Sequence, residues 1–180
     1  MLVTFHPATL EEQAPAKQMS KLLAALSNKS DTTLIFTMPN ADTGGLAIKE
    51  QIQSFVEKND NAYMFESLGQ LNYLSCMAIV DGVVGNSSSG ILEAPSLKVG
   101  TINIGSRQLG RTQSQSVINV EPNTDELIWA LEKLYSKDFK AILRTCKSPY
   151  GDGGASDQIL RKLRDSNLIG IIKKSFFDLG

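Results

Sequence analysis

Histidine and cysteine are scarce in this chain of 180 residues. The sequence has one histidine, His6, and two cysteines, Cys76 and Cys146, which lie far apart. A single histidine cannot build a multi-histidine metal site, and the two cysteines form neither a zinc-binding pattern nor a disulfide framework. We therefore expect no bound metal, and a reducing, cytoplasmic compartment fits this cysteine content best.

Long apolar runs and an excess of positive charge are also missing. No segment approaches the roughly 18 consecutive apolar residues of a membrane span, and the start of the chain lacks the basic leader and cleavage site of a signal peptide. The net charge is -1, with Lys and Arg spread along the chain. This excludes a broad nucleic-acid-binding surface but allows a local site for one small anion. We therefore expect neither a membrane nor a nucleic acid as a partner.

The pattern of apolar residues predicts an α/β fold. Apolar residues make up 42% of the chain. Short apolar runs alternate with longer amphipathic segments, which is typical of repeated βα units and a parallel sheet. We expect one domain over residues 1–180, and its abrupt apolar start indicates a fragment of a longer protein. Strands are predicted at residues 2–5, 33–38, 62–65, 79–84, 101–104 and 117–120.

Helices with apolar residues at helical spacing are predicted between these strands, except between residues 104 and 117, where a loop bearing Arg107 and Arg111 is predicted. Ser67 is predicted to cap a helix that contains Leu71 and Leu74 and that can extend to Met77. Thr124 opens the helix after the last strand, and a further helix begins at about Ser156.

A turn of small polar residues at positions 85–94 carries the clearest chemical signal. It joins a predicted strand to a helix that Pro95 soon disturbs. The first N–H groups of a helix lack partners and bind phosphate readily, and the hydroxyls of Ser87 and Ser88 add donors. The carboxylate of Glu93 can accept hydrogen bonds from both hydroxyls of a ribose. The alternative is a serine cap with an acidic first turn, which is common in helices.

This turn differs from the two best-known nucleotide-binding loops. It has neither the Gly-x-Gly-x-x-Gly fingerprint of dinucleotide sites nor the lysine of a Walker loop. We therefore expect no dinucleotide, no ATP and no cofactor.

Four segments of the sequence form a combined motif: residues 3–7 (VTFHP), 85–93 (GNSSSGILE), 102–111 (INIGSRQLGR) and 148–156 (SPYGDGGAS). Together they resemble the hydrolysing UDP-N-acetylglucosamine 2-epimerases, and the resemblance covers almost the whole chain. Nonhydrolysing relatives carry Ser-Gly-Gly in the turn and His-Arg after the first strand. This chain has Ser-Ser-Ser-Gly and His-Pro instead, which favours the hydrolysing group.

The resemblance implies a Rossmann-like parallel sheet flanked by helices, as the second half of a glycosyltransferase-B type two-domain fold. Residues 1–180 would form the C-terminal UDP-binding domain. The expected partners are a UDP-sugar substrate and the missing N-terminal domain, and the full-length enzyme is expected to be a homo-oligomer.

The resemblance also implies roles in nucleotide binding. Ser87 and Ser88 match the pair that contacts the diphosphate, and Glu93 matches the acid that holds the uridine ribose. Phe65 lies in the segment that flanks the uracil, with a core position as the alternative. Arg107 matches a basic residue near the phosphates, with plain surface charge as the alternative.

His6 is the candidate catalytic residue. It matches a family histidine close to the diphosphate and the sugar. It also follows the first predicted strand, and ligands of open α/β sheets bind at the carboxyl ends of the strands. A structural or exposed histidine is the alternative.

The activity that the resemblance implies is conversion of UDP-N-acetylglucosamine to N-acetylmannosamine and UDP, for sialic acid synthesis. The family's principal carboxylate bases lie in the other domain, so we expect the isolated chain to be inactive. Three alternatives stay open: an epimerase acting on a UDP-diacetamido-trideoxy sugar of the legionaminic acid pathway, a glycosyltransferase-B type transferase, and a non-catalytic nucleotide-sugar-binding domain.

Overall fold

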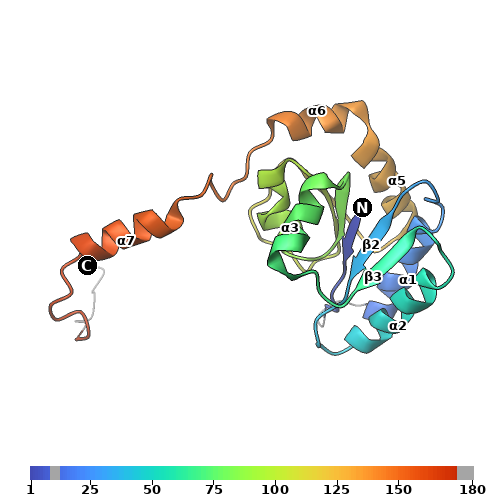
Figure 1. Ribbon diagram of the computed structural model, residues 1–180, viewed down its shortest axis with the longest axis horizontal. Helices are drawn as coiled ribbons and strands as arrows, with labels where there is room; N and C mark the ends of the chain where they lie inside the picture. The colour runs from blue at the N-terminus through green and yellow to red at the C-terminus, as the bar shows by residue number, and fades with distance from the viewer. Residues whose placement is uncertain (9–12, 174–180) are drawn as a thin grey trace. The chain divides into compact units, whose positions relative to one another are not determined.

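A computed structural model describes residues 1–8 and 13–173 of the chain. Within these residues, six parallel strands form one sheet in the order β3-β2-β1-β4-β5-β6 (Figure 1). The strands are Leu2–Thr4 (β1), Leu34–Thr37 (β2), Ala62–Phe65 (β3), Gly82–Gly85 (β4), Gly100–Ile104 (β5) and Val117–Val120 (β6).

Crossover connections join the parallel strands, and each of them contains a helix except the one from β5 to β6. The first half of the chain contains Pro15–Leu26 (α1), Gly45–Val56 (α2) and Gly69–Ile79 (α3). A short helix, Ser89–Leu92 (α4), and a 3-10 turn, Ala94–Leu97 (η1), lie between β4 and β5. After β6 the helices are Thr124–Tyr135 (α5), Lys137–Thr145 (α6) and Ala155–Asp165 (α7).

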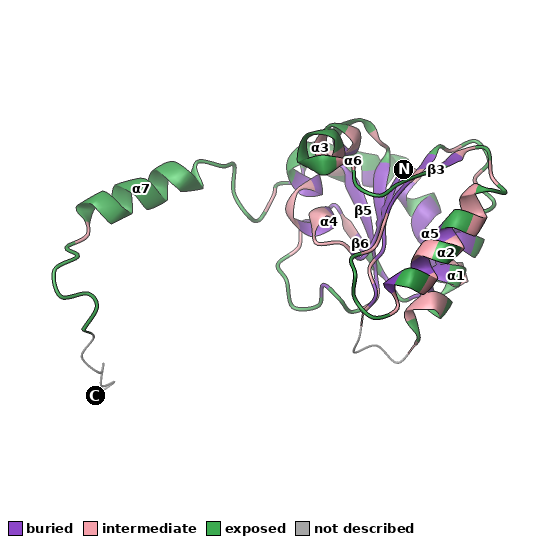
Figure 2. Cartoon of the chain, turned by 60° about the horizontal axis from the view of Figure 1, so that its bottom comes forward, coloured by how far each residue is buried: buried purple, intermediate pink, exposed green. Residues whose placement is uncertain are grey.

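The core lies on both faces of the sheet, because successive strand residues point to opposite sides. Val3 and its neighbours on one face pack with α1, α2 and α5 in the larger buried cluster. Leu2, on the other face, packs with Met77 of α3 and Ala94 of η1 in a smaller one. Figure 2 shows the central strands, such as β5, in purple between these helices. The sheet is therefore fixed from both sides, which gives the loops at its edge a rigid base.

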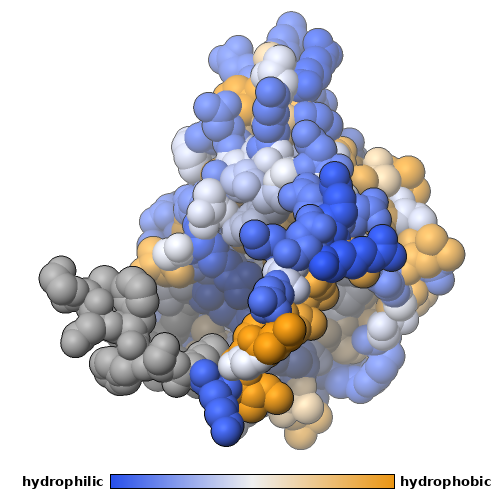
Figure 3. Space-filling view, turned by 90° about the vertical axis from the view of Figure 1, so that its left-hand side faces the viewer, coloured by the Kyte–Doolittle hydropathy of each residue, from blue (hydrophilic) through white to orange (hydrophobic). Residues whose placement is uncertain are grey.

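The chain forms two compact units, residues 1–150 and 151–180, and the first contains the whole sheet. In the second, α7 is exposed along its whole length, as its green colour in Figure 2 shows. Its apolar residues Ile159, Leu160 and Leu163 lie at the surface. Figure 3 shows exposed apolar residues, in orange, among hydrophilic ones.

The predicted Rossmann-like sheet is confirmed, and each of the six predicted strands overlaps an observed one. The fourth begins at Gly82 rather than near Ile79, because α3 continues to Ile79. Among the apolar residues of the helix predicted after Ser67, Leu71 is 79% exposed, and Met77 is the buried residue of α3. Within the described residues, none of the helices has the length and apolar character that crossing a membrane requires.

Candidate functional site

The carboxyl ends of β1 and β4 lie next to each other in the middle of the sheet. From β1 the chain continues toward β2 and β3, whereas from β4 it continues in the other direction, toward β5 and β6. Such a reversal opens a crevice at the carboxyl edge, where open α/β sheets bind their ligands. His6 follows β1, Ser87 follows β4 and Arg107 follows β5. The topology therefore brings three of the predicted site residues to one edge.

Gly85 allows β1 and β4 to approach closely at this edge. Its φ is 139°, and a Cβ atom at this position would collide with the backbone oxygen of Thr4. Only glycine fits such a position without strain. The next residue, Asn86, donates its backbone N–H to the same Thr4 oxygen at 3.2 Å. The loop after β4 therefore starts in contact with the loop after β1.

Asn86 joins these two loops through its side chain. It is 1% exposed, and its Oδ1 accepts a hydrogen bond from the backbone N–H of His6 at 2.7 Å. Its Nδ2 donates to the backbone oxygen of His6 at 2.8 Å. The backbone oxygen of Asn86 accepts hydrogen bonds from Nη1 of Arg107 at 3.0 Å and from Nε2 of Gln108 at 2.8 Å. Three loops therefore meet at this one residue.

His6 is partly buried beside this junction. Its Nδ1 accepts a hydrogen bond from the backbone N–H of Asn40 at 3.2 Å, so the neutral ring carries its proton on Nε2. Burial lowers the pKa of His6, and the nearby positive charge of Arg107 lowers it further, against the opposing effect of Asp42. The imidazole is therefore neutral near pH 7, with an Nε2–H group that can donate a hydrogen bond.

The serine turn ends in a helix that is shorter than expected. α4 has four residues, and its N-cap residue Ser88 makes no side-chain capping hydrogen bond within the described part of the chain. The alternative interpretation of the turn, a serine cap with an acidic first turn, therefore gains no support from Ser88. A single helical turn has a weak dipole, so the hydroxyls and N–H groups of the turn are the main donors for an anion.

A chain of hydroxyl groups orients the turn. The hydroxyl of Tyr73 lies 2.6 Å from Oγ of Ser89, and Ser89 in turn donates to Oγ of Ser87 at 3.1 Å. The backbone N–H of Ser89 also donates to Oγ of Ser87, at 3.4 Å. Ser87 accepts both hydrogen bonds, so its own hydroxyl hydrogen is the group that can donate to a ligand.

A cavity of about 400 Å³ opens in front of these groups. The lining residues that belong to the predicted site are His6, Ser87 and Glu93, and Tyr73 of α3 lies among them. One carboxylate oxygen of Glu93, Oε2, is buried with no hydrogen-bond partner among the described residues. A buried oxygen of this kind is costly unless a ligand supplies donors.

The remaining predicted residues lie around this cavity in different ways. Phe65 ends β3 with its side chain 43% exposed. It does not line the cavity within the described residues, whereas the segment 66–70 that follows it does. Arg107 and Ser88 do not line the cavity either, but Arg107 contacts the backbone next to Ser87.

Sequence reasoning missed three residues of the site: Tyr73, Asn86 and Gln108. Asn86 and Gln108 belong to the motif segments, but buried amide groups with structural partners have no distinctive spacing. Tyr73 lies at an ordinary helix position, and only the fold brings its hydroxyl to the serine turn.

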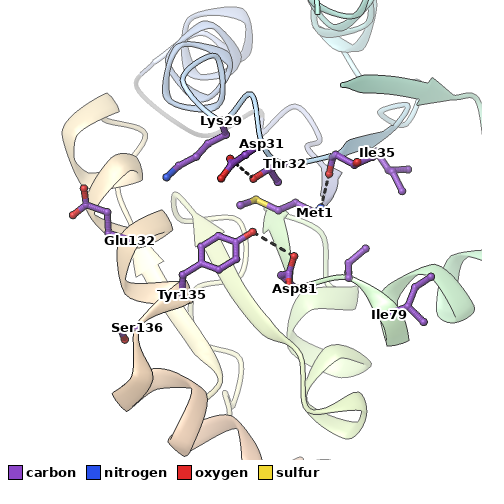
Figure 4. A pocket seen from close by; sticks show the side chains of 12 residues that line it. Met1, Lys29, Asp31, Thr32, Ile35, Ile79, Asp81, Glu132, Tyr135 and Ser136 are labelled. Carbon is purple, nitrogen blue, oxygen red and sulfur yellow. Dashed lines mark hydrogen bonds between the residues drawn. The ribbon is translucent and has the colours of Figure 1, made fainter. Parts of the chain in front are cut away.

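A larger cavity, of about 750 Å³, lies at the opposite edge of the sheet (Figure 4). Met1, Asp81 and Tyr135 line it, and the Tyr135 hydroxyl donates to Oδ2 of Asp81 at 3.5 Å. The predicted site residues are absent from its described lining. In the described part of the chain, no group of three or more His, Cys, Asp and Glu side chains could hold a metal ion.

Comparison with known proteins identifies the family of the chain. The sequence profile of the UDP-N-acetylglucosamine 2-epimerases matches residues 1–164. The chain belongs to this family. It is 43% identical over 180 residues to the GDP/UDP-N,N'-diacetylbacillosamine 2-epimerase (hydrolyzing) of Campylobacter jejuni, covering 99% of this chain and 46% of the relative. It is 35% identical over 165 residues to a polysialic acid biosynthesis protein of Escherichia coli, covering 91% of this chain and 42% of the relative.

The fold also matches that of a solved structure. A structure of Staphylococcus aureus MnaA with UDP superimposes with a TM-score of 0.72 at 17% identity, covering 99% of this chain and 48% of the other. The predicted family, the hydrolysing epimerases, is therefore confirmed. The chain spans about half the length of these relatives.

Proposed function

We propose that this epimerase chain is the C-terminal, UDP-binding domain of a hydrolysing 2-epimerase, and that the crevice between β1 and β4 is its nucleotide site. The unpartnered Oε2 of Glu93 is the observation that carries this proposal. Glu93 lines the cavity, and the hydroxyls of a ribose bound there supply the donors that its carboxylate lacks. The Ser87 hydroxyl points a donor toward the same cavity, where a diphosphate would accept it.

The proposed sites of the three nucleotide parts follow the geometry of the cavity. Glu93 accepts from the ribose, and the serine turn with Ser87 and Ser88 donates to the diphosphate. Arg107 adds positive charge beside the turn. The uracil lies against the segment 66–70, next to Phe65. In this assignment each predicted residue lies near the part of the nucleotide, whether ribose, diphosphate or uracil, that the family resemblance implies for it.

In the chemistry that the family resemblance implies, the C2 proton of the sugar is removed and UDP is expelled, which gives a glycal. Water then adds at C1 while C2 is reprotonated from the other face. This reaction needs bases at C2 and donors that stabilise the leaving diphosphate. The chain's own residues supply the donors. Neutral His6 donates from Nε2 toward the leaving oxygen or the sugar. The bases for C2 belong to the N-terminal domain, so we propose that the isolated chain has no activity.

UDP-N-acetylglucosamine is the first candidate substrate, and the relative in polysialic acid biosynthesis supports a product that feeds sialic acid synthesis. A UDP-linked diacetamido sugar is the second candidate. It is favoured by the 43% identity to the Campylobacter jejuni enzyme, whose name gives N,N'-diacetylbacillosamine as the sugar. The crevice residues described here face the nucleotide and are common to both candidates.

Thermal melting with nucleotides tests the proposed site. UDP should stabilise the chain more than ADP does, and a ligand at a hundredfold excess over its Kd adds about 2.7 kcal/mol. Equal melting shifts with UDP and ADP would contradict the uridine assignment. The same preparation should release no UDP from UDP-N-acetylglucosamine, and release at the rate of a full-length relative would contradict the half-site assignment.

A further inference from the structure

Asn86 is more deeply buried than the residues that face the cavity, yet it touches two of the loops that carry them. Its side chain is 1% exposed and does not line the cavity. Both of its side-chain hydrogen bonds go to the backbone of one residue, His6, through Oδ1 at 2.7 Å and Nδ2 at 2.8 Å. Paired bonds of this kind fix the orientation as well as the distance of the backbone that they hold.

The backbone of Asn86 holds the third loop. Its carbonyl oxygen accepts from Arg107 at 3.0 Å and from Gln108 at 2.8 Å. Gln108 is 2% exposed, so its hydrogen bond to Asn86 is shielded from water. The Arg107 side chain is exposed, so its bond to Asn86 is less shielded. Shielded hydrogen bonds hold a loop more firmly than exposed ones. The positions of His6 and Arg107 are therefore both set relative to Asn86.

We propose that Asn86 is a positioning residue that holds His6, Arg107 and the serine turn in one arrangement at the crevice. The proposal rests on the proposed function only where it takes the crevice to be the nucleotide site. Asn86 is too deeply buried to contact a ligand, so its effect on binding passes through the residues that it holds.

The single histidine provides a direct readout. Because His6 is the only histidine of the chain, its imidazole NMR signals report one site without assignment ambiguity. The charged groups that act on this ring are Arg107 and Asp42, and the Asn40 backbone contacts it. A change in the arrangement of these groups changes the imidazole shifts and their titration.

The test compares Asn86→Ala and Asn86→Asp with the matched control Asn61→Ala. Like Asn86, Asn61 makes two side-chain hydrogen bonds to the backbone, in this case to the oxygens of Lys29 and Thr32. It precedes β3, at the opposite edge of the sheet. Asn86→Ala removes both bonds to His6. Asn86→Asp keeps the acceptor for the His6 N–H and places an oxygen against the His6 backbone oxygen.

We expect both Asn86 variants to shift the imidazole signals and their titration midpoint, and to weaken UDP binding about tenfold or more. Asn61→Ala should lower the melting temperature without changing either quantity. An Asn86 variant can have a lower melting temperature while its imidazole titration and its UDP affinity match those of the unmodified chain. In that case Asn86 only stabilises the fold, and the proposal is overturned.

A second measurement uses the unmodified chain and needs no variant to fold. The backbone N–H of His6 should exchange with solvent as slowly as amides inside the sheet, because Asn86 holds it at 2.7 Å. Exchange at the rate of an open loop would overturn the proposal. If the unmodified chain does not bind UDP at all, the nucleotide assignment fails, whereas the imidazole and exchange results still decide the role of Asn86.

Discussion

Replacing Glu93 by glutamine separates binding of the ribose from stability of the fold. The buried Oε2 has no partner among the described residues, so the free chain carries a desolvated oxygen without a donor. Glutamine has nearly the same shape and no charge, and its burial costs less. The variant should therefore melt at the same temperature as the unmodified chain or slightly higher. With nucleotide bound, it loses a charged hydrogen bond to the ribose, which is worth about 1.5–3 kcal/mol.

This loss corresponds to UDP binding that is roughly 10- to 150-fold weaker. Calorimetric titration with UDP should show the decrease, whereas titration with pyrophosphate should give nearly the same affinity for Glu93→Gln and the unmodified chain. The reasoning is refuted if Glu93→Gln binds UDP normally. A strongly lowered melting temperature without ligand would equally refute it, because the carboxylate would then stabilise the fold.

Three further predictions address the other parts of the site. Arg107→Ala should weaken the binding of UDP and of pyrophosphate to the same extent. This loss of affinity should shrink with added salt, because the side chain is exposed. A loss that does not depend on salt would contradict the role of Arg107 as an exposed charge. Gly85→Ala should lower the melting temperature by roughly 5–10 °C, because its Cβ would collide with the Thr4 backbone. Gly110→Ala, at a φ of 81° with open space among the described residues, is the control and should cost less. The folded state lowers the pKa of His6. The contribution of His6 to the free energy of unfolding is therefore complete above about pH 6.5 and is lost as the pH falls through the pKa that His6 has in the folded chain. The free energy of unfolding of His6→Gln, measured with denaturant, should lack this part of the pH dependence.

The sheet could be predicted because its signal is local. Buried parallel strands are short apolar runs, and two of the six, at residues 62–65 and 117–120, have the predicted limits. The helices were harder to place. α6 was not predicted, since it follows α5 after the single residue Ser136, and only Phe139 is buried on it. Leu71 shows the same weakness, because helical spacing does not say which side of α3 meets the sheet.

The site residues at strand ends could be predicted, whereas the contacts that arrange them could not. Ser87 and Glu93 lie in a turn whose composition is suited to phosphate and ribose, so sequence and resemblance indicate them. Tyr73 and Asn86 act through partners that are far away in the sequence, such as Ser89 at 2.6 Å and His6 at 2.7 Å. The parallel pairing of β1 and β4 brings Asn86 to His6, and the packing of α3 beside η1 brings Tyr73 to Ser89.

The central claim is that UDP binds in the crevice between β1 and β4. Titration of the isotope-labelled chain with UDP, followed through backbone amide and imidazole NMR signals, tests it most directly. We expect the largest shifts at residues 86–93, at residues 66–70 and at the His6 ring. Shifts that gather instead around Met1, Asp81 and Tyr135, in the larger cavity at the opposite edge of the sheet, would contradict the claim.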